Sequence, residues 1–476
     1  MNYETVIGLE VHAELNTKTK IYCSCANEFG AEPNTKCCPI CSGMPGVLPS
    51  LNEKVVESCV KAGLAMNCEI TEYSKQDRKN YFYPDLPKAY QISQFDLPLC
   101  HDGYVDIYVN GETKRIGITR IHIEEDAGKL IHGLDGKESF ADYNRCGVPL
   151  IEIVTEPDFR SPEEAHVFLE TLRNILLFIG VSDCKMQEGS LRCDVNVSVR
   201  PEGQKKLGTR SEMKNVGTFK GAVKAMEFER DRQIAILEQG GTIQQETRRW
   251  DDAKGESVLL RSKEDAHDYR YFPEPDIMPI HIQAETVEEI RKTIPELPNE
   301  KFKRYMDEYG LSEYDASLIA FHIYFAEFFE KCIQEGGNPK AISNWCLGDI
   351  SKILKQKEQE ADASPFAPKA LVELTKLVEA DKISNTSAKK VLDRMFETDK
   401  SPETLVEEMG LLQISDNSFL EGIVDEVMAE NPDTPAQYKN GKTNVLGFLV
   451  GQVMKKSKGK ANPQMVNPMI KERLEK

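Results

Sequence analysis

Apolar and polar residues alternate with a period of two in several stretches of the first half of the chain. In "IGLEVHAEL", the apolar residues Leu9 and Val11 alternate with Glu10 and His12. A period of two is typical of a β-strand that buries one face. The stretches "GITRIHIEEDAGK", "SLRCDVNVSVR" and "GTRSEMKNVG" show the same kind of pattern. We therefore expect four strands, each with an apolar side and a side that carries acids together with His, Arg or Lys.

Two helices are predicted among these strands. The segment "SPEEAHVFLETLRNILLFIG" offers Ser161 as an N-cap, Pro162 as the first helical residue and Gly180 as a stop. A second helix is expected from about Phe219 to Gly240. Beyond "IPELPNE" the pattern becomes helical, and "YDASLIAFHIYFAEFFEKCI" is predicted to form one buried helix. Strands followed by helices predict the α+β fold class.

The sequence predicts three parts of different character. Residues 1–292 mix strands with helices, whereas 293–405 and 406–476 are helical. A chain of 476 residues is too long for one ordinary core, which agrees with several domains. We therefore expect a domain with a mixed or antiparallel sheet, then an all-α domain, then a small helical tail domain.

The polar side of the predicted strands suggests a site for a metal ion and phosphate. The acids and the imidazole on these strands are Glu10, His12, Glu124, Glu125, Asp126, Asp194 and Glu212. Carboxylates that converge with an imidazole are a ligand set for Mg2+ or Mn2+ that bridges substrate phosphates. The cations that could balance phosphate charge are Lys79, Arg192, Arg210 and Lys214. A solvated face of an antiparallel sheet is the alternative, and the sequence alone leaves both interpretations open.

Familiar phosphate-binding loops are absent from the sequence. No two glycines stand two positions apart, so there is no GxGxxG motif. The stretch "NGKTN" at 440–444 resembles a P-loop only in part, because Ala436 stands where the earlier glycine is required. If a nucleotide binds, we expect it on the sheet rather than at a loop that opens a helix.

Five of the thirteen cysteines lie in one short stretch. Cys23 and Cys25 form a CxC pair, and after twelve residues Cys38 and Cys41 form a CxxC pair, which suits a closed, structural zinc site with four thiolates. Cys37 could substitute for Cys38, although the CPxC geometry favours Cys38. The alternative is a cluster of buried apolar thiols. Because the start of the chain shows no export signal, we expect reduced thiols in the cytoplasm rather than disulfides.

The net charge of −18 argues against general nucleic-acid binding. Residues 437–476 are an exception, because they hold nine Lys and Arg against two Glu. Lys455, Lys456, Lys458 and Lys460 are therefore candidates for binding the phosphates of a nucleic acid. A basic terminus that only faces solvent is an equally open alternative.

Eight longer motifs carry a resemblance to a known family. They are "IGLEVHAEL", "FGAEPNT", "DRKNYFYPDLPKAYQISQFD", "HIEEDAGK", "PLIEIVTEPDFRSPEEA", "GSLRCDVNVSVR", "DYRYFPEPDI" and "GFLVGQVMKKSKG". Together they resemble the B subunit of the bacterial tRNA-dependent amidotransferases, from one end of the chain to the other. The resemblance implies a cradle domain, a helical domain and a tail domain.

The resemblance also implies an activity, that of the ATP-dependent kinase subunit of a carbon–nitrogen ligase. Such a subunit phosphorylates the side-chain carboxylate of Glu on tRNA(Gln), of Asp on tRNA(Asn), or of both. Ammonia, which a separate glutaminase (the A subunit) releases from glutamine, then displaces the phosphate. A small C subunit holds the heterotrimer together. The implied cofactors are ATP, Mg2+ and, in the branch of the family with this cysteine cluster, a structural Zn2+.

The same resemblance assigns residues. The metal and nucleotide site falls on Glu10, His12, Glu124, Glu125, Asp194 and Glu212. Of these, Glu10, His12 and Glu125 are the catalytic candidates. The implied phosphate neighbours are Lys79, Ser190, Arg192 and Lys214. The alternative is a catalytically inert, zinc-containing scaffold that binds RNA, for which converging carboxylates would have no use.

Overall fold

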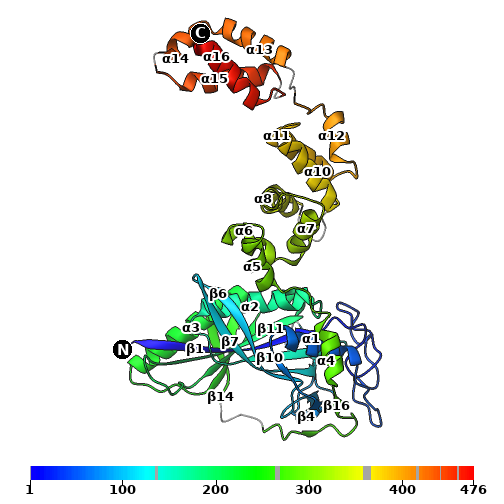
Figure 1. Ribbon diagram of the computed structural model, residues 1–476. Helices are drawn as coiled ribbons and strands as arrows, with labels where there is room; N and C mark the ends of the chain where they lie inside the picture. Colours follow the sequence, from blue (N-terminus) through cyan, green and yellow to red (C-terminus); the bar gives the residue numbers. More distant parts are fainter. Residues whose placement is uncertain are drawn as a thin grey trace. The chain divides into compact units, whose positions relative to one another are not determined.

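The structure is a computed structural model that describes residues 2–133, 138–262, 268–357, 366–413, 417–439, 441–457 and 460–475. The chain divides into two compact units, Met1–Pro298 and Asn299–Lys476 (Figure 1). The described strands all lie in the first unit, and the described elements of the second are helical. The predicted α+β class is therefore confirmed, whereas the boundaries of the three predicted domains stay a prediction.

A nine-stranded sheet forms the centre of the first unit (Figure 1). In spatial order its strands are β14 (Glu256–Ser262), β13 (Glu246–Asp251), β12 (Ser211–Val216), β11 (Leu191–Pro201), β1 (Tyr3–Glu14), β10 (Pro149–Thr155), β7 (Glu112–Glu125), β6 (Cys100–Val109) and β2 (Glu69–Ile70). Neighbours are antiparallel except for the parallel pair β12 and β13. The four strands predicted from alternation are confirmed as β1, β7, β11 and β12.

Three small sheets accompany the large one. They are the sheet of β15 (Phe272–Pro273), β4 (Asp77–Asn80) and β5 (Tyr90–Ser93), the pair β16 (Ile280–His281) and β3 (Tyr73–Ser74), and the pair β8 (Lys129–His132) and β9 (Ser139–Asp142). The first of them packs on β7, where the Ser93 hydroxyl donates a hydrogen bond to Glu124 Oε2 at 3.2 Å. This contact brings Lys79 and the chain around Tyr271 to the polar side of the large sheet.

The two helices predicted for the first unit are confirmed as α2 (Pro162–Phe178) and α3 (Phe219–Glu238). The Ser161 side chain accepts a hydrogen bond from the backbone N–H of Glu164, as an N-cap does. Gly180 follows the helix with a φ of +71°, a left-handed conformation that glycine adopts without strain. The first unit also contains α1 (Glu53–Ala65), the 3-10 helix Met186–Glu188 and α4 (Ala284–Arg291).

One apolar core joins α2 and α3 to the large sheet. Phe168 of α2 and Met226 of α3 share this core with Leu9 of β1 and Val195 of β11, and all four side chains are buried. Because side chains of a strand alternate between two faces, burying Leu9 on one face turns Glu10 to the other. The helices thus decide which side of the sheet carries the polar residues.

The second unit is built from short helices. They are α5 (Pro298–Asp307), α6 (Glu313–Ala320), α7 (Ile323–Gln334), α8 (Pro339–Trp345), a π-helical turn (Cys346–Ile350), α9 (Ser351–Gln356), α10 (Pro368–Glu379), α11 (Asn385–Met395), α12 (Pro402–Glu408), α13 (Asn417–Glu430), α14 (Thr434–Lys439), α15 (Asn444–Lys456) and α16 (Pro463–Glu475). Two separate apolar clusters lie in this unit, one within residues 302–406 and one within 420–474. Nowhere in the described ranges is a helix long and apolar enough to cross a membrane.

The prediction of one buried helix over "YDASLIAFHIYFAEFFEKCI" is wrong. The segment forms α6 and α7, which are separated at His322, where the backbone is extended with φ −121° and ψ 105°. The break lets Phe321 lie 5.8 Å from the ring of Phe302 while Phe329 packs 5.1 Å from Tyr305. Packing of both halves against α5 therefore overrides a local pattern that favours one continuous helix.

We expect Phe168→Ala to lower the free energy of unfolding of the first unit by about 3–5 kcal/mol, because it leaves a cavity in the core. The side chain is fully buried and packs against Phe159. Urea unfolding can be followed by the fluorescence of Trp250 in a Trp345→Phe background, since each unit holds one of the two tryptophans. Phe82→Ala, at a side chain that is 82% exposed, is the control and should change stability by less than about 0.5 kcal/mol. Equal losses in the two variants would contradict the assignment of Phe168 to the core.

Candidate functional site

The register of β1 with its neighbours builds the candidate site. His12 of β1 lies opposite Glu152 of β10 and opposite Arg192 of β11, and Glu152 lies opposite His122 of β7. Residues that face each other in neighbouring strands put their side chains on the same side of a sheet. A polar row of four side chains therefore crosses the middle of the sheet.

The first candidate metal cluster consists of His12, Glu124 and Glu152. His12 Nε2 lies 3.3 Å from Glu152 Oε2 and 3.6 Å from Glu124 Oε1. One ligand atom from each residue lies within 4.8 Å of the other two. Two carboxylates and one imidazole suit Mg2+ or Mn2+, so the donor set fits the predicted ion.

The imidazole and the carboxylates of this cluster favour one another's charged forms. Burial by itself would lower the pKa of His12, but the carboxylates of Glu152 and Glu124 raise it to about 8. Burial would raise the pKa of Glu152, yet His122 and His12 hold it well below its ordinary value. A protonated imidazole thus lies between two ionised carboxylates, where a divalent cation would supply positive charge in its place.

The second candidate metal cluster consists of Glu10, Asp194 and Glu212, again with ligand atoms within 4.8 Å of one another. Lys214 Nζ donates to Asp194 Oδ2 at 2.5 Å and lies 2.8 Å from Glu212 Oε1. Burial raises the pKa of Glu10, and the carboxylates of Glu152 and Glu212 add to this effect. The Lys214 ammonium therefore offsets part of the negative charge of this group of acids.

Both clusters border one polar cavity of about 380 Å³. Its charged lining residues are Glu10, His12, Lys79, Arg120, Glu152, Asp194, Arg210, Glu212, Lys214, Glu246 and Arg261. Tyr269 and Tyr271 form an aromatic part of the wall, and Lys79 Nζ lies 5.1 Å from the ring centroid of Tyr269. The acids of this lining can hold a metal ion, and its Lys and Arg residues can bind the phosphate groups of an ester. The cavity can therefore bind a phosphate ester together with a metal ion.

Glu124 of the first cluster, which contacts His12, is outside the lining of this cavity, and so are three further residues of the predicted metal and phosphate site. The Glu125 carboxylate is bound by Lys88 Nζ and by the backbone N–H of Ile92 at 2.9 Å, and it lines a separate cavity of about 190 Å³. Arg192 donates to Asp126 Oδ2 at 2.6 Å, and Ser190 is buried. The catalytic and phosphate roles predicted for these three residues stay predictions.

Sequence reasoning missed Glu152. It stands in "PLIEIVT", an apolar strand interrupted by one acid, and that single acid in a buried run was the available signal. The cavity-lining residues Arg120 and Arg261 were missed as well. Alternation along β7 already places Arg120 on the face of His122 and Glu124, so its signal was present in the sequence. Arg261 of β14 is placed only by its pairing with Thr247 of β13, which short-range alternation does not reveal.

The four cysteines predicted to bind zinc lie together. Cys41 Sγ lies 3.4 Å from Cys23 Sγ, 3.6 Å from Cys38 Sγ and 3.7 Å from Cys25 Sγ. Cys37 is turned to the backbone instead, because its thiol donates to Asn34 O at 3.4 Å. All thirteen cysteines are free thiols in the structure. The geometry fits a site with four thiolates, and zinc itself stays a prediction.

A thiolate is already favoured at the centre of this cysteine cluster. The thiol of Cys23 and the backbone N–H of Cys38 donate to the Cys41 sulfur and lower its pKa to about 4, against the opposing effect of burial. The buried Lys20 ammonium adds to the effect, with its Nζ 3.7 Å from Cys41 Sγ. The cluster thus favours the deprotonated form that a metal ion requires.

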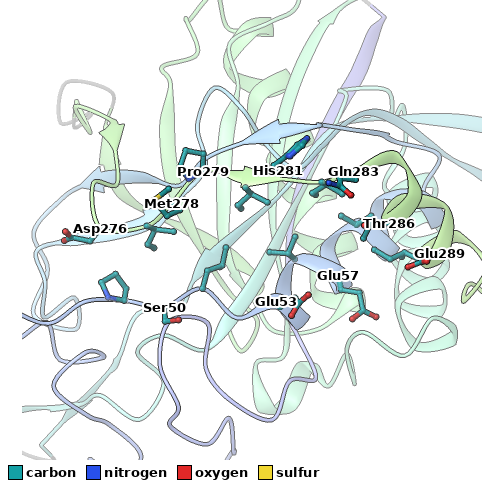
Figure 2. Close-up of a pocket in the computed structure, with 18 of the residues that line it drawn as sticks. Ser50, Glu53, Glu57, Asp276, Met278, Pro279, His281, Gln283, Thr286 and Glu289 are labelled. Carbon is teal, nitrogen blue, oxygen red and sulfur yellow. The ribbon is translucent and has the colours of Figure 1, made fainter.

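A larger cavity of about 800 Å³ lies apart from the candidate site, between α1 and the segment of β16 and α4 (Figure 2). Apolar side chains such as Met278 and Ile280 line it together with Glu53, Glu57 and Glu289. None of the predicted site residues is in its lining. Size alone therefore does not indicate where the chemistry takes place.

The basic residues predicted to bind tRNA lie near the end of α15. Lys455 and Lys456 belong to its last turn, and Lys456 Nζ contacts Glu426 at 2.8 Å and Glu430 at 2.7 Å. Lys460 follows the helix, and Lys458 lies outside the described residues. A surface role for Lys455 and Lys460 stays a prediction, whereas Lys456 already has carboxylate partners.

Comparisons with known proteins agree across the whole chain. Residues 5–288 match a family model described as the GatB/GatE catalytic domain, and residues 327–474 match one described as the GatB domain. The B subunit of an aspartyl/glutamyl-tRNA(Asn/Gln) amidotransferase from Caldicellulosiruptor saccharolyticus is 60% identical, over 100% of both chains. Proteins of the same name from Caldicellulosiruptor bescii and Thermoanaerobacter pseudethanolicus are 61% and 59% identical, also over 100% of both chains.

We expect the purified protein to contain one zinc ion per chain, measured by elemental analysis. Cys38→Ser should lose the ion, because Cys38 Sγ belongs to the cluster around Cys41. Cys37→Ser is the matched control and should keep the ion, because the neighbouring Cys37 thiol is bonded to Asn34 O. Zinc-free wild-type protein, or loss of zinc with Cys37→Ser but not with Cys38→Ser, would contradict the assignment.

Proposed function

The chain belongs to the family of B subunits of the aspartyl/glutamyl-tRNA amidotransferases, and from this premise we propose that it is the kinase subunit of such an enzyme. An oxygen of the side-chain carboxylate of Glu on tRNA(Gln), or of Asp on tRNA(Asn), attacks the γ-phosphorus of ATP. The bond to ADP breaks, and an acyl phosphate forms. Ammonia then attacks the carbonyl carbon, inorganic phosphate leaves, and loss of a proton gives the amide.

The observation that carries this proposal is the polar cavity on the large sheet. It combines two groups of potential metal ligands with Lys79, Arg120, Arg210, Lys214 and Arg261. Transfer of a phosphoryl group from ATP to a carboxylate needs both metal ligands and basic residues. The carboxylate and the phosphates repel each other, and this repulsion must be offset before the reacting atoms can approach. A polar sheet face that only contacted water would not gather acids and bases around a cavity.

The residues of the chain fit this chemistry in detail. His12, Glu124 and Glu152 would hold Mg2+, which supplies positive charge to the phosphate oxygens when it is bound. An ionised carboxylate is already a nucleophile, so the reaction needs no general base. Lys79 Nζ lies over the ring of Tyr269 at the cavity wall, where it can pair with a phosphate.

Partners follow from the same family membership. We propose that the chain acts in a heterotrimer with a glutaminase (the A subunit) and a small third protein (the C subunit), and that it binds mischarged tRNA. The basic residues near the C-terminus are the proposed contact with tRNA phosphates. The cluster of cysteines is proposed to hold a structural zinc ion rather than to take part in the reaction, because four thiolates leave no open ligand position.

We expect Glu124→Gln to lower ATP hydrolysis that depends on mischarged tRNA by about a hundredfold or more, because the change removes one charge from the metal cluster. The assay uses the complex with the A and C subunits, whose basal glutaminase activity should persist. Glu170→Gln is the control, since Glu170 forms a histidine–glutamate pair on α2 away from the cavity. Near-normal ATP turnover in Glu124→Gln would show that the kinase site lies elsewhere.

The same assay on Glu125→Gln tests the catalytic role predicted for Glu125, and unchanged ATP turnover in that variant would exclude this role.

We expect the double variant Lys455→Gln, Lys460→Gln to bind mischarged tRNA more weakly, because it removes two positive charges from the end of α15. Removing each phosphate contact should flatten the log–log salt dependence of binding by about 0.7 to 0.9 units. Filter binding across a salt series on the intact complex measures both quantities. Lys471→Gln, whose ammonium lies 3.9 Å from Glu475, is the control. Unchanged affinity and slope in the double variant would mean that this end of the chain only faces solvent.

A further inference from the structure

A second histidine, His122, lies behind the first metal cluster. Its Nε2 atom is 3.7 Å from Glu124 Oε2 and 3.6 Å from Glu152 Oε2. His12 approaches the same two carboxylates, through Glu124 Oε1 and Glu152 Oε2. Two imidazoles from different strands therefore enclose one pair of carboxylates.

The two histidines differ in their access to the cavity. The His12 side chain is 20% exposed and lines the cavity, whereas the His122 side chain is 4% exposed and is not part of the lining. A cation that enters from the cavity reaches His12 and the carboxylate oxygens first. His122 approaches Glu124 Oε2, whereas His12 approaches Oε1 of the same carboxylate. The Ser93 hydroxyl also donates a hydrogen bond to Glu124 Oε2.

The surroundings of His122 determine which of its nitrogens acts as a donor. Nδ1 is buried and has no hydrogen-bond partner within the described ranges. Nε2 is the nitrogen that faces the two carboxylates, so an N–H at this position is the one that can interact with them. Leaving Nδ1 unpaired in the interior costs free energy, which indicates that this orientation is maintained by the two contacts on Nε2.

We propose that His122 is a positioning residue that orients Glu124 and Glu152 for metal binding and does not itself ligate the metal. The proposal rests on the metal site proposed above. The His122 Nε2 atom lies 3.7 Å from Glu124 Oε2 and 3.6 Å from Glu152 Oε2. Such polar contacts restrict the positions that each carboxylate can take and leave other lone pairs for the cation, as residues next to metal ligands do in many proteins. His122 thereby connects β7 with β10, and His12 joins the same two carboxylates from β1.

The test measures binding of Mn2+ alone to the purified heterotrimer, from the electron paramagnetic resonance signal of free Mn2+. We expect His122→Leu to weaken binding by about 10- to 100-fold, the usual effect of losing a residue that orients metal ligands. His122→Gln keeps an N–H near the Nε2 position and should recover most of the affinity. His166→Leu is the matched control, because His166 also lies near a glutamate, at 3.5 Å, and also has a buried Nδ1 without a partner in the described chain.

A second measurement separates positioning from ligation. Electron spin echo modulation of bound Mn2+ should reveal one directly coordinated nitrogen in the wild type, and this signal should disappear in His12→Gln and persist in His122→Gln. Two coordinated nitrogens in the wild type would overturn the proposal without any variant. Raising the Mg2+ concentration should also restore ATP hydrolysis in His122→Leu, because the loss lies in metal affinity.

The outcomes distinguish this inference from the proposed function. Wild-type protein that binds no Mn2+, with or without ATP, would reject the metal site itself. Wild-type binding together with unchanged affinity in His122→Leu would reject only the role of His122. Equal loss of affinity in His122→Leu and His122→Gln would also reject it, because a general effect on packing would then explain both.

Discussion

The antiparallel pairing of β1 with both β10 and β11 is the interaction on which the candidate site depends. It sets His12 opposite Glu152 and Glu10 opposite Asp194, so both candidate metal clusters draw on residues of β1. A slip of one residue would turn these side chains to the face covered by α2 and α3 and bury their charges in the apolar core. The packing of Leu9 and its apolar neighbours against those helices therefore specifies the register, and the register in turn builds the site.

The polar cavity balances its own charges. Lys214 lies between Asp194 and Glu212, and a protonated His12 lies between Glu124 and Glu152. Buried ion pairs of this kind add little to stability, since desolvation offsets their attraction, but each charge left without its partner is costly. This arrangement lowers the pKa values of Glu152 and Glu212 against the effect of burial, and so favours their ionised forms. Their positions are thus prepared for a divalent cation and for phosphate before either binds.

Two adjacent residues of β7 have different partners. Glu124 contacts His12, which lines the polar cavity, whereas Glu125 is bound by Lys88 in a smaller cavity. Cys23 and Cys41 contribute to the wall of that smaller cavity. A metal ion held by the cysteine cluster would therefore stabilise a turn-rich segment that borders Glu125. This gives a structural role to zinc that involves no step of the reaction.

Much of the fold followed from the sequence because it depends on local chemistry. Alternation identified β1, β7, β11 and β12, the N-cap Ser161 and the stop at Gly180 bounded α2, and paired cysteine spacing identified the four clustered thiols. Tertiary structure alone decided which polar residues meet. Glu152 lies opposite His12 although the two residues are about 140 positions apart in the chain. Glu125 forms an ion pair with Lys88 and does not join the metal clusters. The helix predicted around His322 is interrupted there, so that both halves pack in one core. Local patterns set the faces of strands and the ends of helices, but only the pairing of distant strands and the packing of whole elements determine which faces lie opposite each other.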